Sequence, residues 1–193
     1  MGWWQDFKKF WNFIWYGKSI YSYLAFFVFA IVVLNVAYPA FLFVLSNTVG
    51  INDIVAVVSG SMVHDDSTPQ THYAYLENLG YSTSEISSFP YSNGLYPGDL
   101  LFVWKRTPEN IKAGEVIVFK KDNILIIHRV VQVYNESNNH YFTTKGDHNP
   151  GSLPAEVNIS YELVKGVASN RIPFLGVPKM LLTNFLMAVQ NVL

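Results

Sequence analysis

The chain has 193 residues, half of them apolar and only 14% charged, with a formal net charge of −1. So low a charged fraction indicates that part of the chain does not face water, and the lack of a basic excess argues against nucleic acid as a partner. The sequence contains no cysteine, which excludes disulfides, thiolate metal sites and cysteine nucleophiles. A covalent nucleophile must therefore be an oxygen or an amine.

Residues 1–18 combine indole and phenyl rings with lysines in a helical pattern. This composition is typical of a helix at the lipid headgroup level, so an interfacial helix is expected here. The alternative is an aromatic helix packed on the globular domain. The residues concerned are Trp3, Trp4, Phe7, Phe10, Trp11, Phe13, Ile14 and Trp15, with Lys8, Lys9 and Lys18.

A membrane anchor is predicted at residues 19–46, because Ile20 to Leu45 contains no acidic or basic side chain. As a helix this stretch would reach about 39 Å, longer than a hydrocarbon core of roughly 30 Å. Pro39 is expected to kink it, and Asn35 needs a polar partner. A cleavable secretory signal is the rival interpretation. The lysines before the span predict a cytoplasmic N-terminus, a single pass through the cell membrane and an extracytoplasmic remainder.

The segment at residues 47–171 is predicted to be a mainly β domain, because short apolar, β-branched runs recur between turn signals. Glycine and proline at Tyr96–Asp99 and Lys112–Glu115 mark two of these turns. The predicted strands are Ile54–Val58, Asp99–Trp104, Glu115–Lys120, Ile124–Tyr134, Tyr141–Lys145 and Leu163–Arg171.

Two further segments interrupt or extend this domain. Residues 63–96 form a polar insertion, either lid-like or a solvated decoration, with a short helix ending at Gly80 and another helical turn at Ser84–Ser88. Residues 172–193 predict an amphipathic C-terminal helix. This tail lies either on a membrane or partner surface or against the β domain, which it would then close.

The stretch Val55–Met62 ends an apolar strand in small residues and hydroxyls, which predicts that Ser61 sits at the tip of a strand where the chain turns. A serine needs a base within hydrogen-bond reach to act as a nucleophile. His128 is unusual because apolar residues surround it, although a structural core histidine is the alternative. Asp147 begins a loop, as a solvated turn residue or as the carboxylate of a relay.

Four short motifs follow one another behind the predicted anchor: Ser59-Gly60-Ser61-Met62, Gly98-Asp99-Leu100-Leu101, Ile127-His128-Arg129-Val130 and Lys145-Gly146-Asp147. In this order they resemble the type I signal peptidases of the archaeal and endoplasmic-reticulum kind. The resemblance covers roughly Ile20 to Ile172. It implies a membrane-bound serine endopeptidase with a histidine base, which removes signal peptides from exported preproteins.

By this resemblance Ser61 is the nucleophile, His128 the general base and Asp147 an acidic partner, while Ser59 assists the Ser61 N–H group in the oxyanion hole. Met62, Ile126 and Ile127 match positions near the pocket for small substrate side chains. The resemblance implies no cofactor or metal, and its partners are signal peptides, the lipid bilayer and the translocation channel.

The sequence departs from the family at two places. The insertion begins directly after Met62, and Leu153 stands where relatives often carry a second aspartate. Glu156, Asp65 or Asp66 could replace that second acid.

Two other functions compete with this one. A metal hydrolase could use His64, Asp65, Asp66, His72 and His148, although their spacing fits no recognised ligand pattern. Alternatively, the domain could be a non-catalytic, membrane-anchored subunit that binds extended peptide by strand addition.

Overall fold

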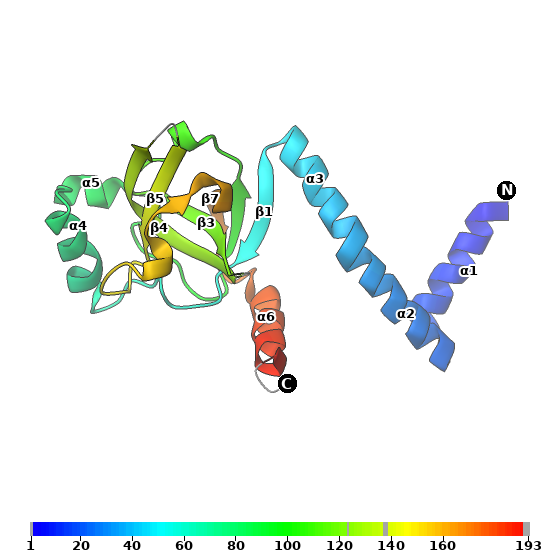
Figure 1. Ribbon diagram of the computed structural model, residues 1–193. Helices are drawn as coiled ribbons and strands as arrows, with labels where there is room; N and C mark the ends of the chain where they lie inside the picture. The colour runs from blue at the N-terminus through cyan, green and yellow to red at the C-terminus, as the bar shows by residue number, and fades with distance from the viewer. Residues whose placement is uncertain (1, 123, 137–138, 191–193) are drawn as a thin grey trace. The chain divides into compact units, whose positions relative to one another are not determined.

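The computed structural model describes residues 2–122, 124–136 and 139–190, and it divides the chain into two compact units that meet between Asn47 and Thr48. The first unit is helical. The second contains the predicted β domain from Thr48 on, with the insertion and the C-terminal helix (Figure 1).

The N-terminal unit consists of α1 (Gly2–Tyr16), α2 (Ile20–Val32), a π-helical turn η1 (Val33–Ala37) and α3 (Tyr38–Thr48). Ser19 caps α2 by accepting the backbone N–H of Ser22, which separates α1 from α2. The two helices contact each other through aromatic edges, with ring centroids 6.0 Å apart for Trp11–Phe29 and 5.3 Å apart for Trp15–Phe26. Of residues 1–18, where a helix is predicted, the structure describes Gly2–Tyr16 as helical.

By length and composition, the described residues contain one helix that could cross a membrane, Ile20–Thr48, with 29 residues and an 18-residue window whose mean hydropathy is 2.5. The irregularity expected at Pro39 takes the form of the π-helical turn just before it. A proline lacks the N–H group of a regular helix and crowds the preceding turn, and a π-turn accommodates both defects. Asn35 meets its polar requirement within the helix, because its side-chain amide donates to the carbonyl of Ile31 at 2.9 Å.

In the part of the chain that the structure describes, seven antiparallel strands form one sheet in the order β1-β2-β7-β3-β4-β5-β6. The predicted mainly β fold is therefore confirmed, and the six predicted strands appear with shifted ends. The short β6 was not predicted, because two residues are too few to show a period. The strands are β1 (Ile51–Ala56), β2 (Leu100–Trp104), β3 (Val116–Lys121), β4 (Ile124–Glu136), β5 (Asn139–Lys145), β6 (Ile159–Ser160) and β7 (Val164–Ile172).

Among the described residues, two apolar clusters that each draw on several strands pack on the sheet, because alternate residues of each strand face opposite sides. One cluster contains Val57, Met62 and Val118, and the other contains Phe119, Val130 and Phe142. The first cluster includes the residue directly after Ser61, so the core itself anchors the candidate nucleophile's turn.

The insertion forms a small helical layer beside β4 and β5 (Figure 1). It contains a π-turn η2 (Pro69–Tyr73), α4 (Ala74–Asn78) and α5 (Thr83–Ser88), so both expected helical turns are present. Leu76 and Ile86 pack on Val131, where the register of β4 and β5 shifts. A bulge takes the bulged residue out of the ladder, and the Tyr81 hydroxyl donates to the Val131 carbonyl at 2.9 Å. The insertion is thus docked on the sheet.

The C-terminal segment forms α6 (Val177–Gln190), as predicted. Gly176 precedes it and donates its backbone N–H to the Gly98 carbonyl at 2.9 Å, which ties the helix to the turn before β2 (Figure 1). Leu181, Leu182 and Phe185 are nevertheless exposed. The helix is therefore anchored to the β domain at its start and carries an apolar surface beyond it.

Candidate active site

Ser61 lies in a tight turn rather than at the tip of a strand. β1 ends at Ala56, and the N–H of Val63 donates to the carbonyl of Gly60 at 3.0 Å. The predicted strand end at Val58 was wrong because Val57 pairs with the Asp99 loop instead of continuing the β1–β2 ladder. The turn leaves the Ser61 side chain partly exposed while Met62 is buried.

His128 is directed at Ser61 from the middle of β4. Its Nε2 atom lies 2.8 Å from the Ser61 Oγ atom, and its side chain is 8% exposed. The register places His128 opposite Ile117 of β3, so the imidazole is held on a strand whose neighbours are fixed. An imidazole at this distance can take the proton of the serine hydroxyl.

Glu156 contacts the other nitrogen of His128. Its Oε1 atom pairs with His128 Nδ1, and its Oε2 atom accepts the N–H of Leu153 at 2.6 Å. The carboxylate ends a short 3-10 turn, Pro154–Glu156, and is 1% exposed. A carboxylate on Nδ1 keeps the proton there and leaves Nε2 free to accept one, which is the orientation that a general base requires.

Asp147, the predicted acidic partner, is placed elsewhere. Its oxygens accept the Nε and Nη2 groups of Arg129 at 2.8 and 2.6 Å, and it lies 2.9 Å from His64 Nε2 and 3.2 Å from His72 Nδ1. Burial works to raise the pKa of Asp147, but the charge and hydrogen bonds of Arg129 and the two imidazoles hold it well below its usual range. Glu156, and not the predicted Asp147, therefore accepts the hydrogen bond of His128 Nδ1.

Asp147 pairs with Arg129 and not with His128, the residue before Arg129 in the sequence, because Arg129 is buried and needs a carboxylate. The guanidinium is fully buried, and it also donates to the carbonyls of Pro90, Gly114 and Tyr91. A buried guanidinium needs a carboxylate partner and acceptors for its donors. The sequence signal for this role is a charged residue inside an apolar strand, and a local pattern does not say which carboxylate pairs with it.

Ser59 lies beside the nucleophile, with its hydroxyl 3.2 Å from the Ser61 Oγ atom. Met62, Ile126 and Ile127, the predicted substrate contacts, all line a groove of about 760 Å³ that also includes Ser61 and His128. The other lining residues are Val55–Ser59, Ile124, Leu125, Asn149, Leu153, Ala155, Glu156, Lys179 and Thr183. No described residue of the insertion lines this groove.

Two open strand edges face this groove. β1 stands at one end of the strand order and pairs with β2 on one side. Residues Ile124–His128 of β4 pair with β3, whereas pairing of β4 with β5 begins only at Arg129. Because residues of both edges line the groove, its walls offer backbone groups and apolar side chains to an extended peptide.

The five residues considered as metal ligands, His64, Asp65, Asp66, His72 and His148, do not lie together in one cluster. His148 Nδ1 lies 3.4 Å from Asp65, near the exposed surface. His64 and His72 meet at Asp147, and Asp66 takes no part in that cluster. Each oxygen of Asp147 has two donor partners, one from Arg129 and one from an imidazole. A hydrogen-bond network already occupies this cluster, and Arg129 places a positive charge beside it, which opposes a cation.

Ser61, His128 and Glu156 place a hydroxyl, an imidazole and an orienting carboxylate in a row beside a groove, and such a row can activate a serine for attack on a carbonyl. The chain is similar to curated catalytic subunits of the signal peptidase complex: SEC11 of Colletotrichum graminicola is 32% identical over 97 residues, 46% of this chain and 56% of that protein. Human SEC11C is 33% identical over 96 residues, which cover 46% of this chain and 50% of that protein. SEC11 of Candida albicans is 34% identical over 95 residues, which cover 45% of this chain and 56% of that protein.

These similarities are partial. The matched region spans about half the length of each of these curated relatives. No family model matches the chain.

Proposed function

We propose that the protein is a membrane-bound serine endopeptidase that cleaves N-terminal signal peptides from exported preproteins. The observation that carries this proposal is the Ser61–His128–Glu156 contact beside an apolar groove. Similarity to catalytic subunits of the signal peptidase complex supports the substrate class. The Ile20–Thr48 helix supports attachment to a membrane. Lys8, Lys9 and Lys18 before it favour a cytoplasmic N-terminus, which puts the site on the other side.

In the first half of the reaction, Ser61 Oγ attacks the scissile carbonyl carbon while its proton passes to His128 Nε2. The Ser61 N–H group and the Ser59 hydroxyl stabilise the negative charge that develops on the carbonyl oxygen. Glu156 stabilises the imidazolium through Nδ1. When the tetrahedral intermediate collapses, the C–N bond breaks, and His128 donates its proton to the nitrogen that becomes the new N-terminus.

In the second half, a water molecule attacks the ester formed with Ser61, and His128 takes one of its protons. The ester bond breaks, the proton returns to Ser61, and the signal peptide leaves with a new carboxylate. The groove binds the substrate as an extended strand between β1 and the first half of β4. Met62, Ile126 and Ile127 contribute to the pocket that accepts small side chains of an Ala-x-Ala ending.

The test is cleavage of a labelled preprotein by the full chain in lipid vesicles. Ser61→Ala and His128→Ala should each abolish cleavage, and wild-type cleavage by either variant would refute the mechanism. If the protein were instead a non-catalytic peptide-binding subunit, wild-type protein would bind the preprotein without cutting it, and Ser61→Ala would bind equally well.

A further inference from the structure

The insertion both begins and ends on the turn that carries Ser61. Its first residue follows Met62, and near its end Leu95 donates its N–H to the Met62 carbonyl at 2.8 Å. Gly94 has a φ of +75°, and a Cβ atom there would lie 2.8 Å from both the Met62 oxygen and the His64 nitrogen. The returning chain therefore lies directly against the outgoing one, and only glycine fits at this contact.

The opposite side of the Ser61 turn rests on the loop that carries Asp147. The N–H of His148 donates to the Ser61 carbonyl at 2.9 Å. A Cβ atom on Gly146 would lie 2.7 Å from that same carbonyl and 2.9 Å from His128 Nε2. The position of this loop therefore determines the position of Ser61 relative to His128.

The insertion holds that loop by its side chains. His64 Nε2 lies 2.9 Å from one Asp147 oxygen and His72 Nδ1 lies 3.2 Å from the other, with the two imidazole rings 4.8 Å apart. Tyr75 of α4 adds its ring, 5.0 Å from the buried ammonium of Lys145. These contacts connect α4 and its preceding turn to residues 145–147.

We propose that the insertion positions the catalytic serine, and that His64 is the positioning residue through which it acts, with His72 in support. The insertion fastens the loop of residues 145–148, and the loop fixes the carbonyl of Ser61. This inference rests on the proposed peptidase function, because it assigns the insertion a role in that reaction. A displacement of about 1 Å at a reacting atom can lower a rate about 100-fold, so a loosened loop should reduce turnover rather than substrate affinity.

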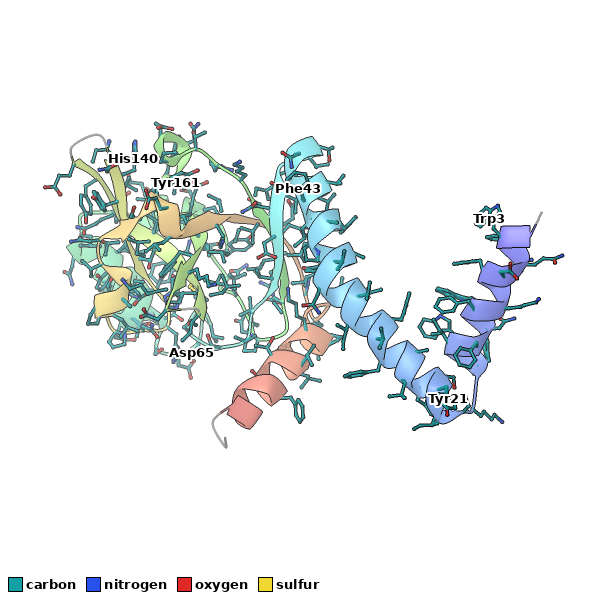
Figure 2. All side chains as sticks on the ribbon, turned by 45° about the vertical axis from the view of Figure 1, so that its right-hand side comes forward. Trp3, Tyr21, Phe43, Asp65, His140 and Tyr161 are labelled. Atoms are coloured by element: carbon teal, nitrogen blue, oxygen red, sulfur yellow. The ribbon has the colours of Figure 1, made fainter. Side chains whose placement is uncertain are left out.

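The experiment compares variants that keep or remove the N–H group that each imidazole directs at Asp147. His64→Gln places an amide N–H near the position of Nε2, and His72→Asn does so near Nδ1, whereas His64→Leu and His72→Leu remove the donor. His140→Leu is the matched control, because His140 lies at the opposite end of the β domain from Asp65, where the insertion begins (Figure 2). Initial rates of preprotein cleavage in vesicles give kcat and KM for each variant.

We expect His64→Leu to lower kcat by 10- to 100-fold with KM within twofold of wild type, and His64→Gln to recover kcat to within threefold. His72→Leu should show a smaller loss, recovered by His72→Asn, and His140→Leu should match wild type. Wild-type kcat in His64→Leu would overturn the proposal. Equal losses in the leucine and glutamine variants would also overturn it.

Hydrogen exchange separates this inference from the proposed function. The His148 amide, bonded to the Ser61 carbonyl, should exchange at least tenfold faster in His64→Leu and at the wild-type rate in His64→Gln. Unchanged exchange in His64→Leu refutes the positioning role whatever the activity. A wild-type protein that cuts no preprotein refutes the peptidase function, while the exchange measurement still decides whether the insertion holds the loop.

Discussion

Replacing Glu156 with glutamine tests the most specific feature of the candidate site. The two oxygens of Glu156 have different neighbours, since Oε1 pairs with His128 Nδ1 and Oε2 accepts the N–H of Leu153. A glutamine must place its amide NH₂ group at one of these positions. At Leu153 two donors would face each other, and at His128 the NH₂ group would favour the imidazole tautomer with its proton on Nε2.

With the NH₂ group on His128, Nε2 carries the proton and can no longer act as the base for Ser61. With the amide oxygen on His128, Nε2 stays free, but the imidazolium that forms in the reaction loses its counter-charge. Loss of the orienting carboxylate in a serine–histidine site lowers kcat by about 10⁴-fold, which corresponds to about 5.5 kcal/mol of transition-state stabilisation. We expect a loss of about 10³- to 10⁴-fold in Glu156→Gln, with KM changed little because the substitution preserves the shape of the groove. Single-turnover cleavage of a labelled preprotein in vesicles isolates the chemical step.

Asp147→Asn is the matched comparison, because it makes the same change on a buried carboxylate nine positions earlier, which pairs with Arg129 instead of His128. Its effect should appear first as a lower melting temperature, since it leaves the Arg129 charge buried without its counter-charge. Glu156→Gln with kcat within threefold of wild type would refute the assignment. So would an Asp147→Asn variant that melts normally but loses 10³-fold in kcat.

Three further predictions follow from other contacts. Burial lowers the pKa of Lys145 from 10.5 to about 8, although the charges of Asp147 and Glu156 act to raise it. Between pH 8 and 10.5 the unfolded chain therefore binds more protons than the folded one. Stability should rise with pH across that window by up to about 1.4 kcal/mol per pH unit, and urea titrations should show a flatter slope in Lys145→Met. Leu76→Ala should cost about 2–5 kcal/mol in the same titrations, because it empties the contact between the insertion and Val131, and a loss under 1 kcal/mol would show that the insertion is not docked. Leu125→Asp puts a charge on an exposed groove residue, so KM should rise at least tenfold with kcat within twofold, whereas Leu79→Asp, an exposed leucine away from the groove, should leave KM unchanged.

Local patterns in the sequence were sufficient for most of the fold. The long apolar run from Ile20, the β-branched runs and the glycine turns depend on residues close together in the chain, so periodicity and composition predict them. Because these patterns are local, they place the ends of the strands inaccurately. Val57 belongs to an apolar run, but its hydrogen bond goes to Asp99, and no local pattern records that contact.

The sequence by itself also drew attention to Ser61, at the predicted end of a strand, and to His128, inside an apolar strand. The order of the four motifs, which resembles that of the type I signal peptidases, assigned them the roles of candidate nucleophile and base. Only the tertiary structure decided which acid serves His128. Asp147 and Glu156 lie in one loop region after β5, and their sequence neighbours do not distinguish them. The choice depends on Arg129, whose buried charge takes Asp147 and leaves Glu156 for the imidazole, a pairing that the register of β4 against β5 brings about.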